Sequence, residues 1–232
     1  MLKLHIMPTN VLGNGIYTLS EAASLVGVSP NQARAWFAGW PKSQSKGVLK
    51  PTDYTAIMRP DLVSFLDLVD VLVVGQLRLV GASMPSIRKA YRAISKKLDS
   101  PHPFGRKELY ADSNGKLFIY AAEETGDDIL AEIVTGQAAF PTILLKYLKR
   151  IDYDPQTHFA RRLNIGKNVV LDAKRRYGKP IVKSAGMATK LLAGAYFSNK
   201  KDADAVADWY GVTSIEVMDA VAFESGPPGI AA

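Results

Sequence analysis

The alternation of apolar and polar residues in the stretch YTLSEAASLVGVSPNQARAWFAGW, near the N-terminus, predicts two short helices joined by a tight turn. Thr18 is placed to cap the first helix, and Glu21, three residues later, completes a capping box. Gly27 ends that helix. Ser29 caps the second helix, and Pro30 occupies its first position, where a missing N–H has no cost. The apolar stripe of the first helix comprises Leu19, Ala22, Ala23 and Val26.

A longer and strongly apolar helix is expected to begin at Asp61, over the sequence DLVSFLDLVDVLVVGQLRLV, and to end at Gly81. Ser83 and Pro85 then open an amphipathic helix over residues 84–98. One face of this second helix carries Ile87, Tyr91, Ile94 and Leu98. The opposite face carries Arg88, Lys89, Arg92, Lys96 and Lys97.

The rest of the chain has shorter and more mixed patterns. An Asn-Gly turn pair lies between strand-like flanks, which predicts a β-hairpin over residues 106–120. Residues 152–168 are expected to be irregular, and the VVLD sequence at 169–172 is typical of a short strand. A helix fits residues 188–197, and residues 202–224 repeat the order helix, Gly turn, helix.

These elements predict a mainly α protein with small β-hairpins, in which an N-terminal winged helix-turn-helix is followed by a C-terminal helix-turn-helix-like domain. The loop or hairpin over residues 41–60 is the expected wing. The predicted organisation is a flexible N-terminus (1–16), a DNA-binding domain (17–100), a hairpin and helical connector (101–164), a second domain (165–224) and a disordered tail (225–232).

Composition narrows the possible partners. The chain has 232 residues, of which 47% are apolar, which suffices for one large core or two small ones. The net charge of +7 favours an anionic partner, most often nucleic acid. Cysteine is absent, which excludes a disulfide framework and suits a reducing cytoplasm. Since the apolar runs are too short for a bilayer and no signal peptide is recognisable, we expect a cytoplasmic protein without membrane contact.

The polar residues that open the second short helix have the chemistry of DNA recognition. In a helix-turn-helix, this end of the second helix enters the major groove. Asn31 and Gln32 can pair at two points with adenine, and Arg34 with guanine. Basic residues of the wing and of the amphipathic helix are expected to contact phosphates, so that binding weakens steeply with salt. They are Lys42, Lys46, Lys50, Arg88 and Arg92.

An alternative for the same stretch is a surface αα-hairpin whose polar residues face only water. Trp36, Phe37 and Trp40 are interpreted as core or hinge residues rather than as platforms for base stacking, because they lie at the far end of the reading helix.

The residues Tyr17 to Ala23, Gly27 to Pro30 and Ala33 to Trp36 follow the pattern Y-T-x-x-E-A-A-x-x-x-G-V-x-x-x-x-V-R-x-W in large part. This arrangement resembles the MerR-type winged helix-turn-helix. The helices expected from Leu62 and Met84 resemble the second helix pair of that family. The resemblance implies DNA binding by the second short helix, with backbone contacts from the wing. The chain departs from MerR activators in lacking a long dimerising coiled coil and a ligand or metal domain, which disfavours an inducer-sensing activator.

The second helix pair has the opposite charge. Residues 202–224 contain six Asp or Glu and no Lys or Arg, so phosphates would repel this unit. Its apolar positions either complete a core or form a protein interface. Just upstream, residues 161–183 contain eight Lys or Arg and one Asp. An acidic unit beside a basic strip favours self-association or a charged protein partner.

The strand at 169–172, the Gly178-Lys179-Pro180 motif and the helix pair that ends at Glu224 resemble an antitoxin-associated domain of unknown function, family 433. That family typically shows G-R-P-x-I-x-G-T-R before a two-helix unit. Here the expected Thr-Arg is replaced, because Met187-Ala188-Thr189 follow the second glycine. This departure puts in doubt any role of that arginine. With the first unit, the resemblance covers about residues 15–100 and 165–224.

This combination of modules resembles the antitoxin of a type II system whose toxin is a PIN-like ribonuclease. The resemblance implies a homodimer that binds its operator, a double-stranded DNA, and represses its own operon. Such toxins hold Mg²⁺ in a carboxylate cluster, which an inserted basic side chain would block. The candidates for this toxin contact are Arg175, Arg176 and Lys179.

No catalytic constellation is recognisable. His5, His102 and His158 have no metal-ligand spacing, so no metal site and no cofactor are expected. The protein is therefore expected not to be an enzyme, and a metal-dependent nuclease is the most distant alternative. Two nearer alternatives stay open, which are a stand-alone MerR-like transcriptional regulator without a toxin partner and an interaction scaffold that binds no DNA.

Overall fold

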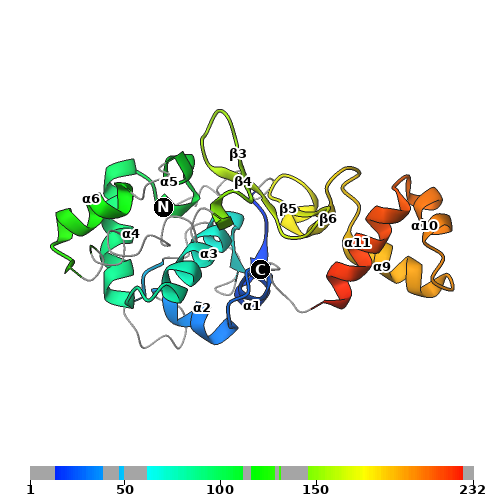
Figure 1. Cartoon of the computed structure of the whole chain (residues 1–232), viewed down its shortest axis with the longest axis horizontal. Coiled ribbons are helices and arrows are strands. Elements are labelled where there is room, and N and C mark those ends of the chain that lie inside the picture. The colour runs from blue at the N-terminus through cyan, green and yellow to red at the C-terminus, as the bar shows by residue number, and fades with distance from the viewer. Residues whose placement is uncertain are drawn as a thin grey trace, which may run out of the picture.

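The computed structural model describes residues 14–38, 47–49, 62–111, 116–128, 131 and 146–226 (Figure 1). The fold is mainly helical, with two small antiparallel sheets, as the sequence predicted. None of the helices in these residues is long and apolar enough to cross a bilayer. The predicted flexible start is described only from residue 14, and the predicted tail only as far as residue 226.

The first unit begins with β1 (Tyr17–Thr18), α1 (Leu19–Leu25) and α2 (Pro30–Trp36). The side chains of Thr18 and Ser29 each accept a 3.2 Å hydrogen bond from the amide three residues later, which confirms both N-caps. Gly27 adopts a φ of 73° between the helices, a conformation that favours glycine. The capping box predicted for α1 is only half formed, because the Glu21 carboxylate forms an ion pair with Lys179 instead.

The next elements are β2 (Leu62–Val63), α3 (Phe65–Leu79) and α4 (Met84–Leu98). Strand β2 pairs with β1, and nearly every side chain of α3 is buried. The helix begins later than expected, because Ser64 and Asp67 form a capping box in which each side chain bonds the other's backbone amide. In α4 the predicted apolar face is confirmed, since Ile87, Tyr91 and Ile94 are buried.

The β-hairpin predicted over residues 106–120 is wrong. After η1 (Pro103–Gly105), the chain forms α5 (Lys107–Ala111) and α6 (Lys116–Thr125) there. The Asn-Gly pair itself lies outside the described residues. The helical outcome follows from Leu117, Phe118, Ala121 and Ala122, which are buried together at helical spacing while α6 packs on α4. The helical spacing of these apolar residues outweighs the turn preference of the Asn-Gly pair, because a strand would have exposed half of the apolar side chains.

An antiparallel sheet follows, in the order β3 (Ile151–Tyr153), β4 (Ala160–Asn164), β5 (Val169–Asp172) and β6 (Pro180–Val182). Strand β5 confirms the prediction from VVLD, whereas β4 lies in the segment expected to be irregular. The neighbouring charges of Arg161 and Arg162 hide its pattern in the sequence, although Leu163 is fully buried and pairs with Leu171. The sheet also spans the boundary expected between residues 164 and 165.

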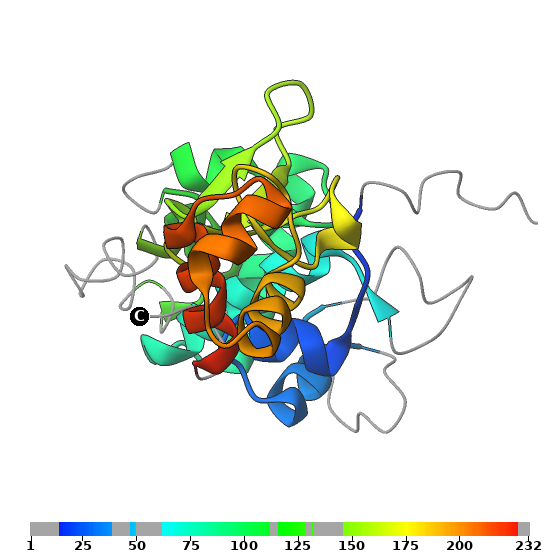
Figure 2. The same ribbon diagram turned by 90° about the vertical axis from the view of Figure 1, so that its right-hand side faces the viewer.

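The C-terminal bundle consists of α9 (Thr189–Ser198), α10 (Ala203–Tyr210) and α11 (Ser214–Ser225). It lies at the opposite end of the molecule from α4 and α6 (Figure 1), and Figure 2 looks onto it. The bundle has its own core, which comprises Val182, Leu192, Val206, Ala207, Val217 and Ala220. The predicted Gly turn is confirmed, because Gly211 follows α10 with a φ of 64°.

Candidate nucleic-acid interface

The N-terminal end of α2 presents its polar side chains at the surface. Asn31 and Gln32 are exposed, and Arg34 is half-buried. Arg34 Nη1 donates to Asn31 Oδ1 at 3.1 Å, and Ser29 Oγ donates to Gln32 Oε1 at 3.0 Å. Water competes with such surface bonds, so they can be exchanged for bonds to a ligand at little cost. The N-terminal end of α2 is therefore accessible to a ligand.

The opposite end of α2 is buried. Trp36 and Phe37 belong to the main core, which confirms their interpretation as packing residues, and Trp40 lies outside the described residues. Ala23 and Ala33 are completely buried between α1 and α2, where small side chains let the two helices approach closely. The C-terminal end of α2 is therefore fixed in the core, whereas its polar N-terminal tip is accessible.

The segment that the sequence predicts to be a wing, and which we call the wing, begins from an anchored base. Ala38 donates to the Leu49 carbonyl at 2.6 Å, and the Leu49 amide donates to the Trp36 carbonyl at 2.9 Å. Lys42, Lys46 and Lys50 lie outside the described residues.

The basic face of α4 contains both engaged and available side chains. Lys89 forms a 3.1 Å ion pair with Asp127, and the Lys97 ammonium lies 4.0 Å from the centroid of the Tyr120 ring. Arg92, in contrast, is exposed.

Arg88 and Arg92 both lie beside the base of the wing. Arg88 Nε donates to the Gly47 carbonyl at 3.4 Å. Arg92 lines a groove together with Lys96 and the wing residues Gly47 and Val48. Two residues predicted to contact phosphate are thus brought to the wing, although they follow it by about forty positions in the sequence.

The three residues predicted to contact a toxin have different surroundings. They lie in or next to η2 (Arg176–Gly178), between β5 and β6. Lys179 Nζ lies 2.6 Å from both carboxylate oxygens of Glu21, which ties this loop to α1. The Arg175 guanidinium packs against Gly186. Arg176 is exposed, and among the described residues it forms no ion pair.

The surroundings of the β5–β6 loop explain why positions 178 and 186 are occupied by glycine. Gly178 and Gly186 have φ values of 78° and 69°, which disfavour other residues. A Cβ on Gly178 would lie 2.1 Å from Tyr17 Oη, and one on Gly186 would lie 1.9 Å from Arg175 Nη2. Tyr17, which is fully buried, donates a 2.7 Å hydrogen bond to the Gly178 carbonyl. The N-terminal strand is therefore locked to the β5–β6 loop.

The acidic C-terminal unit divides its apolar residues between a core and the surface. Val206 and Val217 are fully buried, whereas Trp209 and Ile215 are 62% and 63% exposed. The large apolar side chains exposed on α9, α10 and α11 are Leu191, Phe197, Trp209, Ile215 and Met218. Core packing alone does not account for them.

Acidic side chains also stabilise the ends of these helices. Glu216 completes a capping box with Thr213 at the start of α11. Hydrogen bonds from the Ser184 hydroxyl and the Thr213 backbone amide lower the pKa of Glu216.

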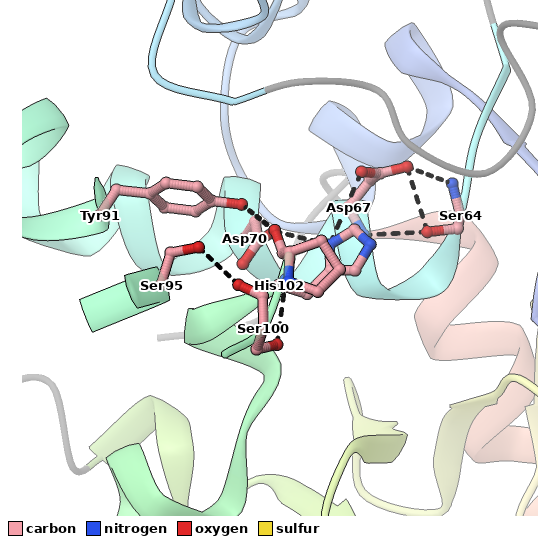
Figure 3. A network of polar contacts seen from close by, with 8 residues as sticks. Ser64, Asp67, Asp70, Tyr91, Ser95, Ser100 and His102 are labelled. Carbon is pink, nitrogen blue, oxygen red and sulfur yellow. Dashed lines mark hydrogen bonds and ion pairs between the residues drawn. The ribbon is translucent and has the colours of Figure 1, made fainter. Parts of the chain in front are cut away.

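A buried polar cluster, which the sequence did not predict, joins α3 to η1 (Figure 3). We call Asp67, Asp70 and His102 the Asp–His cluster. Each of the three is at most 3% exposed. His102 Nδ1 lies 2.9 Å from Asp70 Oδ2 and 3.9 Å from Asp67 Oδ1. Burial raises the pKa of Asp70, and the hydrogen bond and charge of His102 offset part of this effect.

The cluster was missed because its members have no recognisable spacing. His102 comes 32 residues after Asp70, and only the fold brings them together. The available signal was the pair of aspartates, three residues apart in an otherwise apolar helix, since a charge buried in a core needs a partner. His158, by contrast, lies at the surface, 3.4 Å from Glu108.

Comparisons with known proteins extend along most of the chain. No family model matches it. It is 29% identical over 227 residues to a protein of Mycobacterium tuberculosis named "Putative antitoxin VapB45", covering 89% of this chain and 92% of that protein. The crystal structure of Rv2018 from Mycobacterium tuberculosis is similar in fold, with a TM-score of 0.68 at 24% identity. That likeness covers 88% of this chain and 96% of the other.

Proposed function

We propose that this protein is a sequence-specific DNA-binding antitoxin, which neutralises a PIN-like ribonuclease toxin and represses its own operon. The observation that carries the proposal is its similarity to the protein named as the antitoxin VapB45, which extends along nearly the whole of both chains. An antitoxin acts by binding, so its role is regulatory rather than catalytic.

The DNA-binding part is a MerR-like winged helix-turn-helix over residues 17–100. Helix α2 enters the major groove with Asn31, Gln32 and Arg34 at its leading end, where these side chains are accessible. Arg88 and Arg92, which lie beside the base of the wing, contact the phosphates that flank the groove.

The toxin contact is made by the loop between β5 and β6. Of its three basic candidates, Lys179 already neutralises Glu21, and Arg175 packs within the chain. Arg176 is accessible, and its backbone lies in the left-handed region with a φ of 49°. It is therefore the side chain that enters the carboxylate cluster of the toxin, where a guanidinium can pair with the carboxylates and block the binding of Mg²⁺.

The homodimer forms through the exposed apolar side chains of the C-terminal bundle. Trp209 and Ile215 are large, apolar and mostly exposed, and the cores of homodimer interfaces are rich in such residues. This arrangement keeps the dimer contact at the opposite end of the molecule from α4 (Figure 1).

Co-expression with the product of each neighbouring gene tests the proposal, which expects one of them to be a PIN-like ribonuclease toxin. The wild-type chain should restore growth and co-purify with the toxin. Arg176→Ala should lose both effects, whereas Lys167→Ala, which removes an exposed charge from the same basic strip, should retain them. Full neutralisation by Arg176→Ala would refute the toxin contact. If no neighbouring gene product is toxic or binds the chain, a stand-alone MerR-like regulator is the better account.

A further inference from the structure

A cavity lies between the start of α3 and the sheet, away from every residue assigned above to DNA, toxin or dimer contacts. Its volume is about 280 Å³, close to the lower end of the range for small-molecule sites, about 300–1,000 Å³. Three segments contribute to its lining, which are residues 64–66 at the start of α3, residues 159–161 at the start of β4 and residues 173–174 just after β5. A ligand in this cavity would therefore touch elements that lie far apart in the sequence.

Arg161 brings an unpaired positive charge to the cavity. Its Nε is buried and has no hydrogen-bond partner, and among the described residues its side chain forms no ion pair. Arg162, the next residue, has the same chemistry but is paired, because its Nη2 lies 3.0 Å from Asp172 Oδ2. Since nearly all buried polar groups in native proteins have a partner, the orphaned donor of Arg161 indicates a partner from outside the chain, which is a ligand, an ion or water.

The backbone around Arg161 is also irregular. Asp152 pairs with Arg162 and Tyr153 pairs with Ala160, so Arg161 is the extra residue of a β-bulge and has no opposite residue on β3. Bulges change the direction of a side chain and are frequent beside active sites. The bulge is thus a second observation, independent of the missing hydrogen bond, that sets Arg161 apart from the rest of the sheet.

The other charges that line the cavity balance one another. Lys174 Nζ lies 2.9 Å from Asp154 Oδ2. Asp154 Oδ1 accepts hydrogen bonds from the amides of Gln156 at 3.1 Å and Thr157 at 3.0 Å. Asp154 is the only acid among the described residues that line the cavity, so one positive charge, that of Arg161, is left over.

The uncharged part of the lining is largely apolar. Phe65 and Leu66 contribute from α3, and Phe159 and Ala173 contribute from the side of the sheet. A ligand with one negative charge and an apolar body fits this lining, because a guanidinium pairs with a carboxylate at two points. A doubly charged phosphate fits it less well, since one of its charges would stay unbalanced in apolar surroundings.

We propose that this cavity binds a small organic monocarboxylate, whose carboxylate pairs with Arg161 and whose apolar body lies against Phe65, Leu66 and Phe159. The bound ligand joins the start of α3 to the sheet, and so stabilises the packing of the N-terminal unit on the rest of the chain. The site requires neither DNA nor a toxin, so it stands independently of the proposed antitoxin function.

Isothermal titration calorimetry on the full chain tests the proposal, with benzoate and hexanoate as probes. At least one of them should bind at a single site and raise the melting temperature, because a ligand that binds only the folded state stabilises it. The neutral analogues benzamide and hexanamide should bind about tenfold more weakly, because they lose the charge-assisted bonds. Arg161→Gln should weaken the binding of the carboxylate by a similar factor. Arg176→Gln, which removes an exposed arginine outside the cavity, should leave it unchanged.

If neither carboxylate binds, or if the amides or Arg161→Gln give the same affinity, the proposal is overturned and water solvates Arg161. Inorganic phosphate that binds as tightly as the carboxylates would overturn the choice of an apolar carboxylate. Should Arg161→Gln fail to fold, wild-type crystals soaked with para-bromobenzoate decide. An anomalous bromine peak in the cavity beside Phe65 and Arg161 supports the site, and a peak elsewhere or none overturns it.

Discussion

Gly178→Ala tests whether the N-terminal strand is locked to the β5–β6 loop as the structure indicates. The substitution forces alanine into a left-handed conformation with a φ of 78°, which costs about 1–2 kcal/mol. It also places a Cβ 2.1 Å from Tyr17 Oη, which has no free space around it because Tyr17 is fully buried. Displacing this hydroxyl breaks its bond to the Gly178 carbonyl and leaves buried polar groups unsatisfied, at a further cost of about 1–3 kcal/mol. The expected total loss is about 2–5 kcal/mol.

Gly27→Ala is the matched control. Gly27 lies in the turn between α1 and α2 and has a nearly equal φ of 73°, but a Cβ there would meet no atom within 4 Å. It should therefore lose only the conformational part, about 1–2 kcal/mol. Equilibrium unfolding in urea, followed by circular dichroism, gives both values. In the Tyr17→Phe background the cost of Gly178→Ala should fall, because the nearest clashing atom is gone. Equal losses of unfolding free energy in the two glycine variants would refute the stabilising contact between Tyr17 and the β5–β6 loop.

Three further predictions concern the charged and apolar surfaces. Arg92→Ala should reduce the slope of log affinity for DNA against log salt concentration by about 0.9, as measured by fluorescence anisotropy. Lys107 is also exposed, and Lys107→Ala should leave this slope unchanged. Glu216→Ala should destabilise the C-terminal bundle by about 1 kcal/mol at neutral pH. The pKa of Glu216 in the folded protein lies below its ordinary value of 4.5, so this contribution is complete above pH 4.5 and is lost as the pH falls through the folded pKa. The free energies of unfolding of the wild type and of Glu216→Ala should therefore converge in acid. Trp209→Ser should raise the dimer dissociation constant about tenfold or more in analytical ultracentrifugation, while Asp208→Ser has little effect.

Short-range rules predicted the elements whose ends are set locally. The caps at Thr18 and Ser29 and the turns at Gly27 and Gly211 follow from the preferences of single residues, and the structure confirms them. Strong periodicity likewise located α3 and α4. The hairpin prediction failed because the burial of an entire helical face of α6 outweighs the local turn preference. That burial depends on the elements that α6 packs against, which the local sequence does not show.

Long-range contacts decide which candidate residues are available, and no local pattern reports them. Lys179 and Arg176 are both basic residues of one loop, and the sequence gives no reason to prefer either as a binding residue. Only the fold brings Glu21 to Lys179 and leaves Arg176 exposed. The Asp–His cluster is a second example, because His102 reaches α3 only through the turn that follows α4. The accessibility of Asn31, in contrast, was predictable, because the start of a capped surface helix is normally polar and solvated.

Binding of the purified chain to the DNA upstream of its own gene tests the central claim most directly. In a gel-shift titration at low salt with excess non-specific competitor, the wild-type protein should form a discrete complex that weakens steeply as salt is added. Asn31→Ala/Gln32→Ala should weaken this complex by about tenfold or more, because each two-point base contact contributes about 1–3 kcal/mol of discrimination. No complex at low salt, or an unchanged affinity for the double variant, would contradict the assignment of α2 as the reading helix.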